Sequence, residues 1–342
     1  MGRMSPDQLT QTDLDRTEAT VLAVLQGQPV EDAACANGME PTNLSDAASV
    51  FRQAGREALA SHAAQREWWH VYLHFTDWHR ADHMFSTHVL PLLHDAETAG
   101  SLDGWWYTRK HPCWRLRLRH NPRSHETTPI GQELDRLVSQ GHLLRWWPGI
   151  YEPETVAFGG AASMQAAHQL FAADSRHIQQ LPLHANLPLG ARELSVLLCS
   201  TLMRAAGLEW YEQGDVWHRV ITAEHRDRLA DLPQEALHGD VEPIRALLTS
   251  DTAALLVPGG PLEPVQDWVA AFDHAGQTLL QSVQLGTLDR GLRQVLSYHV
   301  IFHWNRLGLS LTAQSRLAAA ARTAILHTDT MSDAAHQTSW AR

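Results

Sequence analysis

A strict alternation of arginine and leucine at residues 114–119, Trp-Arg-Leu-Arg-Leu-Arg, constrains the fold more than any other feature of this chain. Successive residues of a β-strand face opposite sides of the sheet. The two leucines are therefore predicted to face a core, and Arg115, Arg117 and Arg119 to form a cationic stripe on the other side. Adjacent guanidinium groups repel one another unless an anionic or carbonyl-rich ligand lies over them. The stripe is a candidate binding surface, although an ion-pair ladder is the alternative.

Runs of aromatic and branched residues on the N-terminal side of this stretch predict two more strands, at residues 68–75 and 104–109. Residues 78–94 between them carry apolar side chains at helical spacing. The order strand, helix, strand, strand over residues 67–121 predicts an α+β fold, in which a mixed or antiparallel sheet is packed with helices.

Helical patterns dominate the rest of the chain. A helix is predicted around residues 132–140, and from Ala161 onward the chain is mostly helical by period. Residues 1–62 are polar, alanine-rich and divided by turn signals, which indicates two or three short helices. We therefore expect an N-terminal helical extension over 1–62 and a catalytic domain over 63–342.

Composition excludes several classes of protein. The net charge of −11 over 342 residues argues against a general nucleic-acid binder, which would carry a positive footprint. No stretch approaches the roughly 18 apolar residues of a membrane span, and the N-terminus has no apolar signal core, so a cytoplasmic location is expected. Cys35, Cys113 and Cys199 are isolated, which indicates neither a disulfide framework nor a zinc knuckle.

Tryptophan is unusually abundant, and adjacent pairs occur at residues 68–69, 105–106 and 146–147. On a strand, one indole of such a pair faces the core while its neighbour faces outward or into a cleft. A cleft with aromatic walls is therefore plausible beside the packed core.

Histidine spacing raises the alternative of a metal site. His79 and His83 are four residues apart with Asp82 beside the second, and His299 and His303 repeat that spacing. Either pair could supply two ligands from one helical face, but no third ligand is identifiable and no His-Glu-x-x-His occurs. We expect no metal and no cofactor. The nucleophile elbow Gly-x-Ser-x-Gly and the phosphate loop are also missing from the sequence.

Four short motifs occur in an order that resembles a known family. They are Trp-Arg-Leu-Arg-Leu-Arg at 114–119, Tyr-Glu-Pro-Glu-Thr-Val-Ala-Phe-Gly-Gly at 151–160, Phe-Ala-Ala-Asp-Ser at 171–175 and Phe-His-Trp-Asn-Arg-Leu-Gly at 302–308. Together they resemble the C-terminal, glutamate-eliminating domain of lantibiotic dehydratases and its stand-alone relatives in thiopeptide biosynthesis. The resemblance covers residues 67 to about 310 and implies the fold of that elimination domain.

The resemblance implies one of two chemistries. Some members remove glutamate from glutamylated Ser or Thr, leaving dehydroalanine or dehydrobutyrine, and others are pyridine synthases that join two dehydroalanines by a formal [4+2] aza-cycloaddition. Eliminating members usually carry Arg-Tyr-Gly-Gly where this chain has Ala157 and Phe158 before its Gly-Gly pair. Losing that guanidinium would weaken a site for free glutamate. We therefore favour the pyridine synthase and keep the eliminating lyase as the alternative.

Candidate proton-transfer groups lie in a predicted helix at 296–307. Histidines four residues apart share a helical face, so His299 and His303 do, whereas Ser297 lies about 120° from His303. Ser297 and His303 are the first candidates for proton transfer or amide orientation, and Tyr298 and His299 are the next. For each of them the alternative role is structural.

The remaining site residues are assigned through the resemblance. Arg117 and Arg119 match the paired arginines of the family and are expected to bind substrate carbonyls, with Arg115 beside them. The other residues expected to contact substrate are Tyr151, Glu152, Glu154, Asn305 and Arg306. A carboxylate of the Tyr-x-x-Glu region could anchor an arginine of the stripe.

The expected partner is a precursor peptide with its leader, modified to contain dehydroalanines and azoles. The resemblance implies that water and the leader peptide are lost as the six-membered ring becomes aromatic. A homodimer is one option for the oligomeric state. A third, non-enzymatic possibility is that the N-terminal helices make the protein a docking module that escorts a peptide between enzymes.

Overall fold

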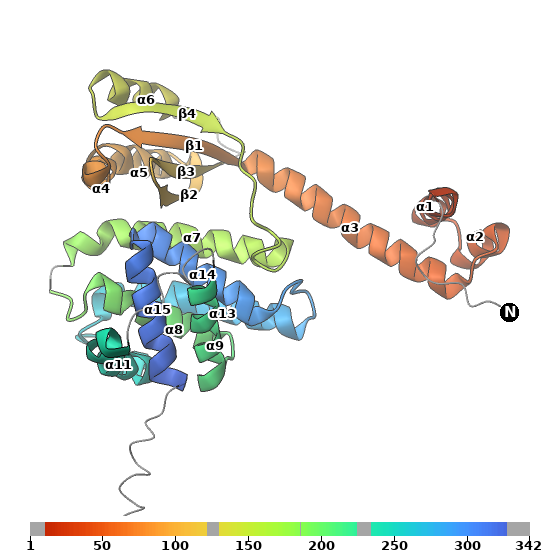
Figure 1. Cartoon of the computed structure of the whole chain (residues 1–342). Coiled ribbons are helices and arrows are strands. Elements are labelled where there is room, and N and C mark those ends of the chain that lie inside the picture. Colours follow the sequence, from red (N-terminus) through yellow and green to blue (C-terminus); the bar gives the residue numbers. More distant parts are fainter. Residues whose placement is uncertain (1–10, 122–129, 185, 224–233, 327–342) are drawn as a thin grey trace, which may run out of the picture. The chain divides into compact units, whose positions relative to one another are not determined.

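The computed structural model describes residues 11–121, 130–184, 186–223 and 234–326 (Figure 1). The chain divides into two compact units, Met1–Arg66 and Glu67–Arg342. The first unit contains helices α1 (Gln11–Leu25), α2 (Val30–Asn37) and most of α3 (Pro41–Glu67). Its buried apolar side chains are Val21, Ala33, Ala34, Leu44 and Ala48. Helix α3 runs through the boundary expected near residue 62, so the division falls a few residues later.

The second unit is built on an antiparallel sheet of four strands. They are β1 (Trp68–Phe75), β2 (Leu102–Lys110), β3 (Cys113–His120) and β4 (Leu143–Gly149), in the order β2-β3-β1-β4. Strand β1 pairs with both β3 and β4, and β2 pairs with β3. With a helical connection between β1 and β2 and another between β3 and β4, this is the split β-α-β arrangement. The α+β expectation is confirmed, and β4 is a strand that the sequence did not predict.

Strand pairing confirms the arrangement of the arginine stripe. Arg115, Arg117 and Arg119 lie opposite Tyr72, His70 and Trp68 of β1. The two leucines between them have no exposed surface and belong to the main core. The alternation of residues 114–119 therefore separates a cationic face of the sheet from an apolar one, as expected.

Helices cover the apolar face of the sheet. They are α4 (Ala81–Met84), a π-helical turn at Phe85–Val89, α5 (Leu90–Thr98) and α6 (Ile130–Ser139), and Phe85 packs against Trp105, Tyr107 and Trp114. The helix predicted over 78–94 is thus interrupted. Pro91 has no amide hydrogen to donate to the preceding turn, which is a physical reason for the irregular turn before it.

The remaining helices form a second layer beyond the β2 edge of the sheet (Figure 1). Among them, α7 and α14 pack against β2, and α7 and α13 pack against each other. The bounds are α7 (Ala161–Gln180), α8 (Ala191–Ala205), α9 (Trp210–Thr222), α11 (Gln234–Thr249), α12 (Thr252–Leu255), α13 (Gln266–Gln284), α14 (Leu292–Leu307) and α15 (Leu311–Leu326). In the described part of the chain, no helix is both long and apolar enough to cross a bilayer.

The Gly-Gly pair before α7 makes the sharp turn expected of it. Gly159 and Gly160 have φ angles of 82° and 106°, which residues other than glycine rarely adopt. A Cβ atom on Gly159 would also lie 2.5 Å from Leu288 Cδ1. The pair therefore brings the loop from residue 151 back against the helical layer, directly beside the cationic face of the sheet.

Candidate active site

The cationic face of the sheet carries aromatic rings and histidines beside its arginines. Strand alternation places residues of all four strands on this face, which we call the arginine face. They are Trp68, His70, Tyr72 and His74 of β1, Trp106 and Thr108 of β2, Arg115, Arg117 and Arg119 of β3, and Arg145 and Trp147 of β4. Each tryptophan pair contributes one indole to this face and one to the opposite side, as the sequence predicted.

Arg117 lies at the centre of the arginine face and is 4% exposed. Its Nη1 donates hydrogen bonds to Thr108 Oγ1 at 2.8 Å and to the Arg115 carbonyl at 3.0 Å. The guanidinium carbon lies 4.2 Å from the centre of the Trp106 ring. Burial lowers the pKa of Arg117 to about 10, so the group remains cationic at neutral pH. These hydrogen bonds use Nη1 and leave Nε of the guanidinium without a described partner.

Several buried nitrogen atoms on this face have no hydrogen-bond partner among the described residues. They are His70 Nε2, His74 Nδ1, Trp106 Nε1, Arg117 Nε and Arg119 Nε. Buried polar groups are normally paired, so the unpaired N–H donors of Trp106, Arg117 and Arg119 on one face indicate a place for carbonyl or carboxylate oxygens. His70 is neutral and donates from Nδ1 to the Ile150 carbonyl, so its Nε2 can accept a hydrogen bond. The arginine face is therefore the strongest candidate for substrate binding in this chain.

A buried tyrosine and histidine close the inner end of the arginine face. Tyr151 is 3% exposed, and its hydroxyl lies 2.5 Å from His168 Nε2 of α7. Burial, followed by the nearby positive charges of Arg119 and Arg117, lowers the pKa of His168 to about 4. Burial also raises the pKa of Tyr151 above its usual range. His168 is thus a neutral acceptor for the phenol proton, and sequence reasoning did not single it out.

Aromatic rings form a wall between this pair and α14. Phe158 has no exposed surface, and its ring centre lies 5.2 Å from that of Phe171, 5.0 Å from Phe302 and 4.9 Å from His299. Neither ring nitrogen of His299 has a hydrogen-bond partner among the described residues. Burial, with a smaller effect from Arg306, lowers the pKa of His299 to about 3. The histidine is neutral and enclosed by apolar rings.

Tyr298 is the most accessible of the four proton-transfer candidates. It is half-buried, its ring centre lies 6.3 Å from that of Phe158, and the Arg290 guanidinium lies 5.2 Å from its ring centre. The side chain therefore borders the aromatic wall while keeping contact with solvent.

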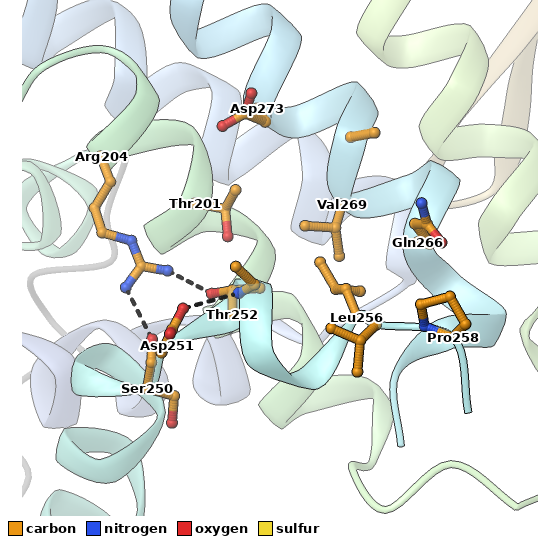
Figure 2. A pocket seen from close by; sticks show the side chains of 13 residues that line it. Thr201, Arg204, Ser250, Asp251, Thr252, Leu256, Pro258, Gln266, Val269 and Asp273 are labelled. Carbon is orange, nitrogen blue, oxygen red and sulfur yellow. Dashed lines mark hydrogen bonds between the residues drawn. The ribbon is translucent and has the colours of Figure 1, made fainter. Parts of the chain in front are cut away.

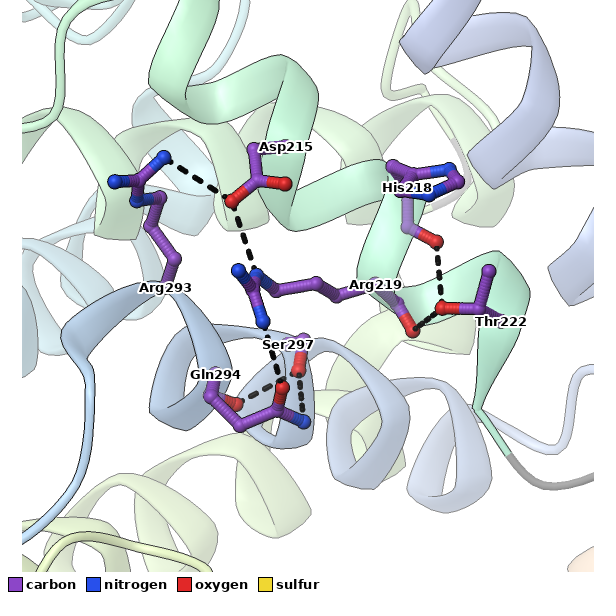
Figure 3. Close-up of polar contacts among 7 residues, drawn as sticks. All are labelled: Asp215, His218, Arg219, Thr222, Arg293, Gln294 and Ser297. Atoms are coloured by element: carbon purple, nitrogen blue, oxygen red, sulfur yellow. Dashed lines mark hydrogen bonds and ion pairs between the residues drawn. The ribbon is translucent and has the colours of Figure 1, made fainter.

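Ser297 lies beside polar residues of α9 (Figure 3). Its hydroxyl donates to the Gln294 carbonyl at 2.7 Å and lies 3.4 Å from Gln294 Nε2. Gln294 accepts a hydrogen bond from Arg219, which also pairs with Asp215. The structure thus does not bring Ser297 and the arginine stripe together.

His303 and Arg306 belong to a buried network centred on Asp174 of α7. Asp174 has no exposed surface and accepts hydrogen bonds from Arg306 Nε at 2.6 Å, Trp268 Nε1 at 2.9 Å and His303 Nδ1 at 3.0 Å. Burial alone would raise the pKa of Asp174, but the charges and hydrogen bonds of His303 and Arg306 outweigh it and lower that pKa. The network ties α7 to α13 and α14.

Arg306 also connects this network to the aromatic wall. Its guanidinium carbon lies 4.3 Å from the centre of the Phe171 ring, which faces Phe302 at 5.4 Å with an interplanar angle of 14°. Asp174 belongs to the motif at residues 171–175, but its role could not be predicted, because the sequence does not show which buried cations approach its carboxylate.

The other expected substrate contacts are more dispersed. Asn305 is half-buried, and its Oδ1 accepts a hydrogen bond from Gln314 of α15. Glu152 and Glu154 are exposed, and neither forms an ion pair with the arginine stripe within the described chain. The charge of Glu154 acts on Arg117 at longer range, raising its pKa against the effect of burial.

The histidine pairs considered as metal ligands do not gather further ligands in the described residues, where no three His, Cys, Asp or Glu side chains could hold an ion. Asp82 pairs with Arg109 instead. A cavity of about 760 Å³ lies elsewhere, between α8, α13 and the segment around α12, and is lined by Arg204, Thr252 and Val269 among others (Figure 2). It shares no lining residue with the arginine face.

Three buried histidines with lowered pKa values predict acid sensitivity. Folding holds His70 and His168 near pKa 4 and His299 near 3, so between those values and about pH 6.5 the unfolded chain binds more protons. The free energy of unfolding should therefore decrease as pH falls from about 6.5 to 4, by up to about 1.4 kcal/mol per pH unit for each histidine. Urea unfolding at pH 7, 5.5 and 4.5 measures this, and His168→Gln should reduce the slope. An unchanged slope in that variant would contradict the assignment.

Comparison with known proteins now identifies the family. The family described as "Lantibiotic biosynthesis dehydratase C-term" matches residues 68–325, well over half of the chain. The chain belongs to this family. The match begins with β1 and ends in α15, so all members of the arginine face and the Asp174 network lie within the lantibiotic dehydratase C-terminal family region. No curated protein sequence matches the chain significantly.

Solved structures share the fold at low sequence identity. The tRNA-dependent lantibiotic dehydratase MibB from Microbispora sp. 107891 aligns over 80% of this chain and 28% of its own, with a TM-score of 0.59 and 18% identity. TsrL aligns over 75% of this chain and 94% of its own, with a TM-score of 0.52 and 15% identity. TbtD, a pyridine synthase from thiomuracin biosynthesis, aligns over 77% of this chain and 98% of its own, with a TM-score of 0.50 and 12% identity. This chain thus spans about a quarter of MibB.

Proposed function

We propose that this protein modifies a ribosomally made precursor peptide in thiopeptide antibiotic biosynthesis, as a pyridine synthase. The observation that carries this proposal is the aromatic wall. Phe158, at the position where eliminating members usually have a tyrosine preceded by arginine, is fully buried against Phe171, Phe302 and His299. Phe302 and Tyr298, the half-buried rings packed against it, suit flat, neutral groups such as two alkenes and a forming aromatic ring better than a departing glutamate.

The proposed reaction joins two dehydroalanines and needs little covalent help from the protein. One dehydroalanine and its preceding amide react as the imidic-acid tautomer, a 2-azadiene, with the second alkene; loss of water and then of the leader as an amide gives the pyridine. Holding both alkenes together lowers the entropic barrier, by roughly 7–11 kcal/mol at best. A formal cycloaddition requires no cofactor.

Roles for individual residues follow from position. Arg117 and Arg119 offer free donors to amide carbonyls, and Arg115 extends them toward solvent. Tyr298 borders the wall and is placed to donate or accept a proton, whereas neutral His299, enclosed behind Phe158, supports the wall. Ser297, His303 and Arg306 act through their contacts, by fixing the position of α14.

The arginine face favours glutamate elimination as a second candidate. Arg117 is buried, cationic and without a carboxylate partner in the described chain, which also suits the side chain of a glutamyl ester. The two reactions differ in their products, so one experiment separates them.

The test is mass spectrometry of two peptides incubated with the purified protein alone. With a precursor containing dehydroalanines and azoles, we expect loss of water and a freed leader amide, and a turnover at least tenfold lower for Tyr298→Phe. Release of glutamate from a glutamylated peptide, with the first peptide unchanged, would show that the protein is an eliminating lyase and not a pyridine synthase. If neither peptide changes, both reactions are rejected for these substrates, whereas activity of the purified protein alone excludes a pure escort.

A further inference from the structure

The outer end of the arginine face carries a stack of aromatic rings that the proposed chemistry does not use. The ring centres of Tyr72 and Trp147 are 5.1 Å apart at an interplanar angle of 12°, and Tyr72 stacks on His70 at 4.5 Å and 29°. The Arg145 guanidinium lies 4.7 Å from the Trp147 ring centre. Tyr72 and Trp147 are half-buried and Arg145 is exposed, so this end is open to solvent.

A glycine of β4 makes the stack possible. Gly149 lies opposite His70, and a Cβ atom there would be 2.6 Å from Tyr72 Cε2 and 3.6 Å from His70 Cγ. The Tyr72 ring therefore leans across the glycine backbone, where any side chain would displace it. The stack is built into the sheet and does not depend on a chance rotamer of surface side chains.

Unpaired positive charge surrounds this stack. Arg115 lies 5.8 Å from the Tyr72 ring centre, and neither Arg115 nor Arg145 forms an ion pair with a described residue. Several other arginines of the described chain, such as Arg136 and Arg176, pair with carboxylates, and the whole chain has a net charge of −11. Local cations left unpaired on an acidic protein favour an anionic partner. Ile150, directly after β4, adds an apolar side chain that is 83% exposed.

We propose that Tyr72, Trp147, Arg115 and Arg145 form a docking strip for a planar aromatic or heteroaromatic ring of the substrate peptide, within an acidic stretch. A ring stacks on the Trp147 indole, and the exposed Arg145 side chain moves aside or covers the ring's other face. Acidic groups next to the ring bind the two guanidiniums. The strip holds a part of the peptide outside the buried reaction centre, which orients the rest along the arginine face.

This inference rests on the proposed function, because it assumes a peptide substrate, but its test does not require turnover. The probes are two acetylated acidic pentapeptides of equal charge, one with two tryptophans and the other with two leucines, and calorimetry measures their dissociation constants. We expect the tryptophan peptide to bind at least tenfold more tightly, and Trp147→Leu to remove that preference while Trp147→Phe keeps most of it. Arg145→Gln should weaken both peptides and reduce the salt dependence of binding.

The matched control is a pair of strand glycines. Gly149→Ala should abolish the preference by displacing Tyr72, whereas Gly104→Ala, on the same face but with no atom nearer than 3.8 Å to its new Cβ, should retain it. Equal affinities for the two peptides, or a preference that survives Trp147→Leu, would overturn the strip. Pyridine formation is measured on the same preparations. Turnover without a preference for the tryptophan peptide would reject only the docking strip. A preference for the tryptophan peptide without turnover would reject only the proposed reaction.

Discussion

Replacing Asp174 with asparagine should lower the free energy of unfolding by about 3–5 kcal/mol, the largest stability effect we expect from one substitution. The carboxylate is fully buried and accepts hydrogen bonds from His303, Arg306 and Trp268. Removing its charge leaves the Arg306 guanidinium buried without compensation, while Nη1 and Nη2 of that group already have no described partner. Urea denaturation at pH 7 measures the loss.

A half-buried carboxylate that also bridges two arginines gives the control. Asp215 pairs with Arg219 and Arg293 at the surface, so Asp215→Asn should cost less than about 1 kcal/mol. Combining Asp174→Asn with Arg306→Gln should cost clearly less than the sum of the single substitutions, because the second removes the stranded charge. A loss below about 1 kcal/mol for Asp174→Asn would contradict the buried network.

The same network has a defined pH dependence. Because folding lowers the pKa of Asp174 below its ordinary value of 3.8, its stabilisation is complete above the unfolded pKa and is lost as pH falls through the folded one. This loss begins below about pH 4, at more acidic values than the histidine effect described above.

Replacing Arg117 with alanine should lower turnover at least tenfold, the largest effect on activity that we expect from the arginine stripe. A hydrogen bond from a charged group contributes about 1.5–3 kcal/mol, and Arg117 presents its free Nε at the centre of the face. Folding should survive, because its only described hydrogen-bond acceptors are Thr108 Oγ1 and the Arg115 carbonyl. Mass-spectrometric rates and thermal unfolding of the same variant measure both.

Two further variants make the result interpretable. Arg117→Lys keeps the charge but loses the planar fork, so it should recover only part of the rate. Arg136→Ala removes a guanidinium that pairs with Glu133 on the surface and should leave turnover unchanged. A near wild-type rate for Arg117→Ala would refute the role of the stripe.

Local sequence patterns predicted three of the four strands and failed to predict β4. The alternation at 114–119 predicted β3 and its two faces correctly, and the runs at 68–75 and 104–109 predicted β1 and β2. Strand β4 was not predicted, and it contains Pro148, which lacks an amide hydrogen and is unusual inside a strand. The structure accommodates this proline since β4 is an edge strand, paired only with β1.

The candidate site divides in the same way. Spacing correctly placed Arg115, Arg117 and Arg119 on one face, but it could not show that His168 would meet Tyr151 or that Asp174 would meet His303. These contacts join residues 17 and 129 positions apart. Helical periodicity also could not show that Tyr298 would lie beside the aromatic wall while Ser297 lies beside α9.

The sequence by itself determined which side chains share a strand face and which residues turn the chain, because alternation, glycine and proline act through the local backbone. Only the tertiary structure decided which buried charges are paired. Asp174 is neutralised by Arg306 across two helices, whereas Arg117 meets no carboxylate in the described chain. Burial and distance between remote segments set that difference, and it leaves the arginines of the sheet free to bind a ligand.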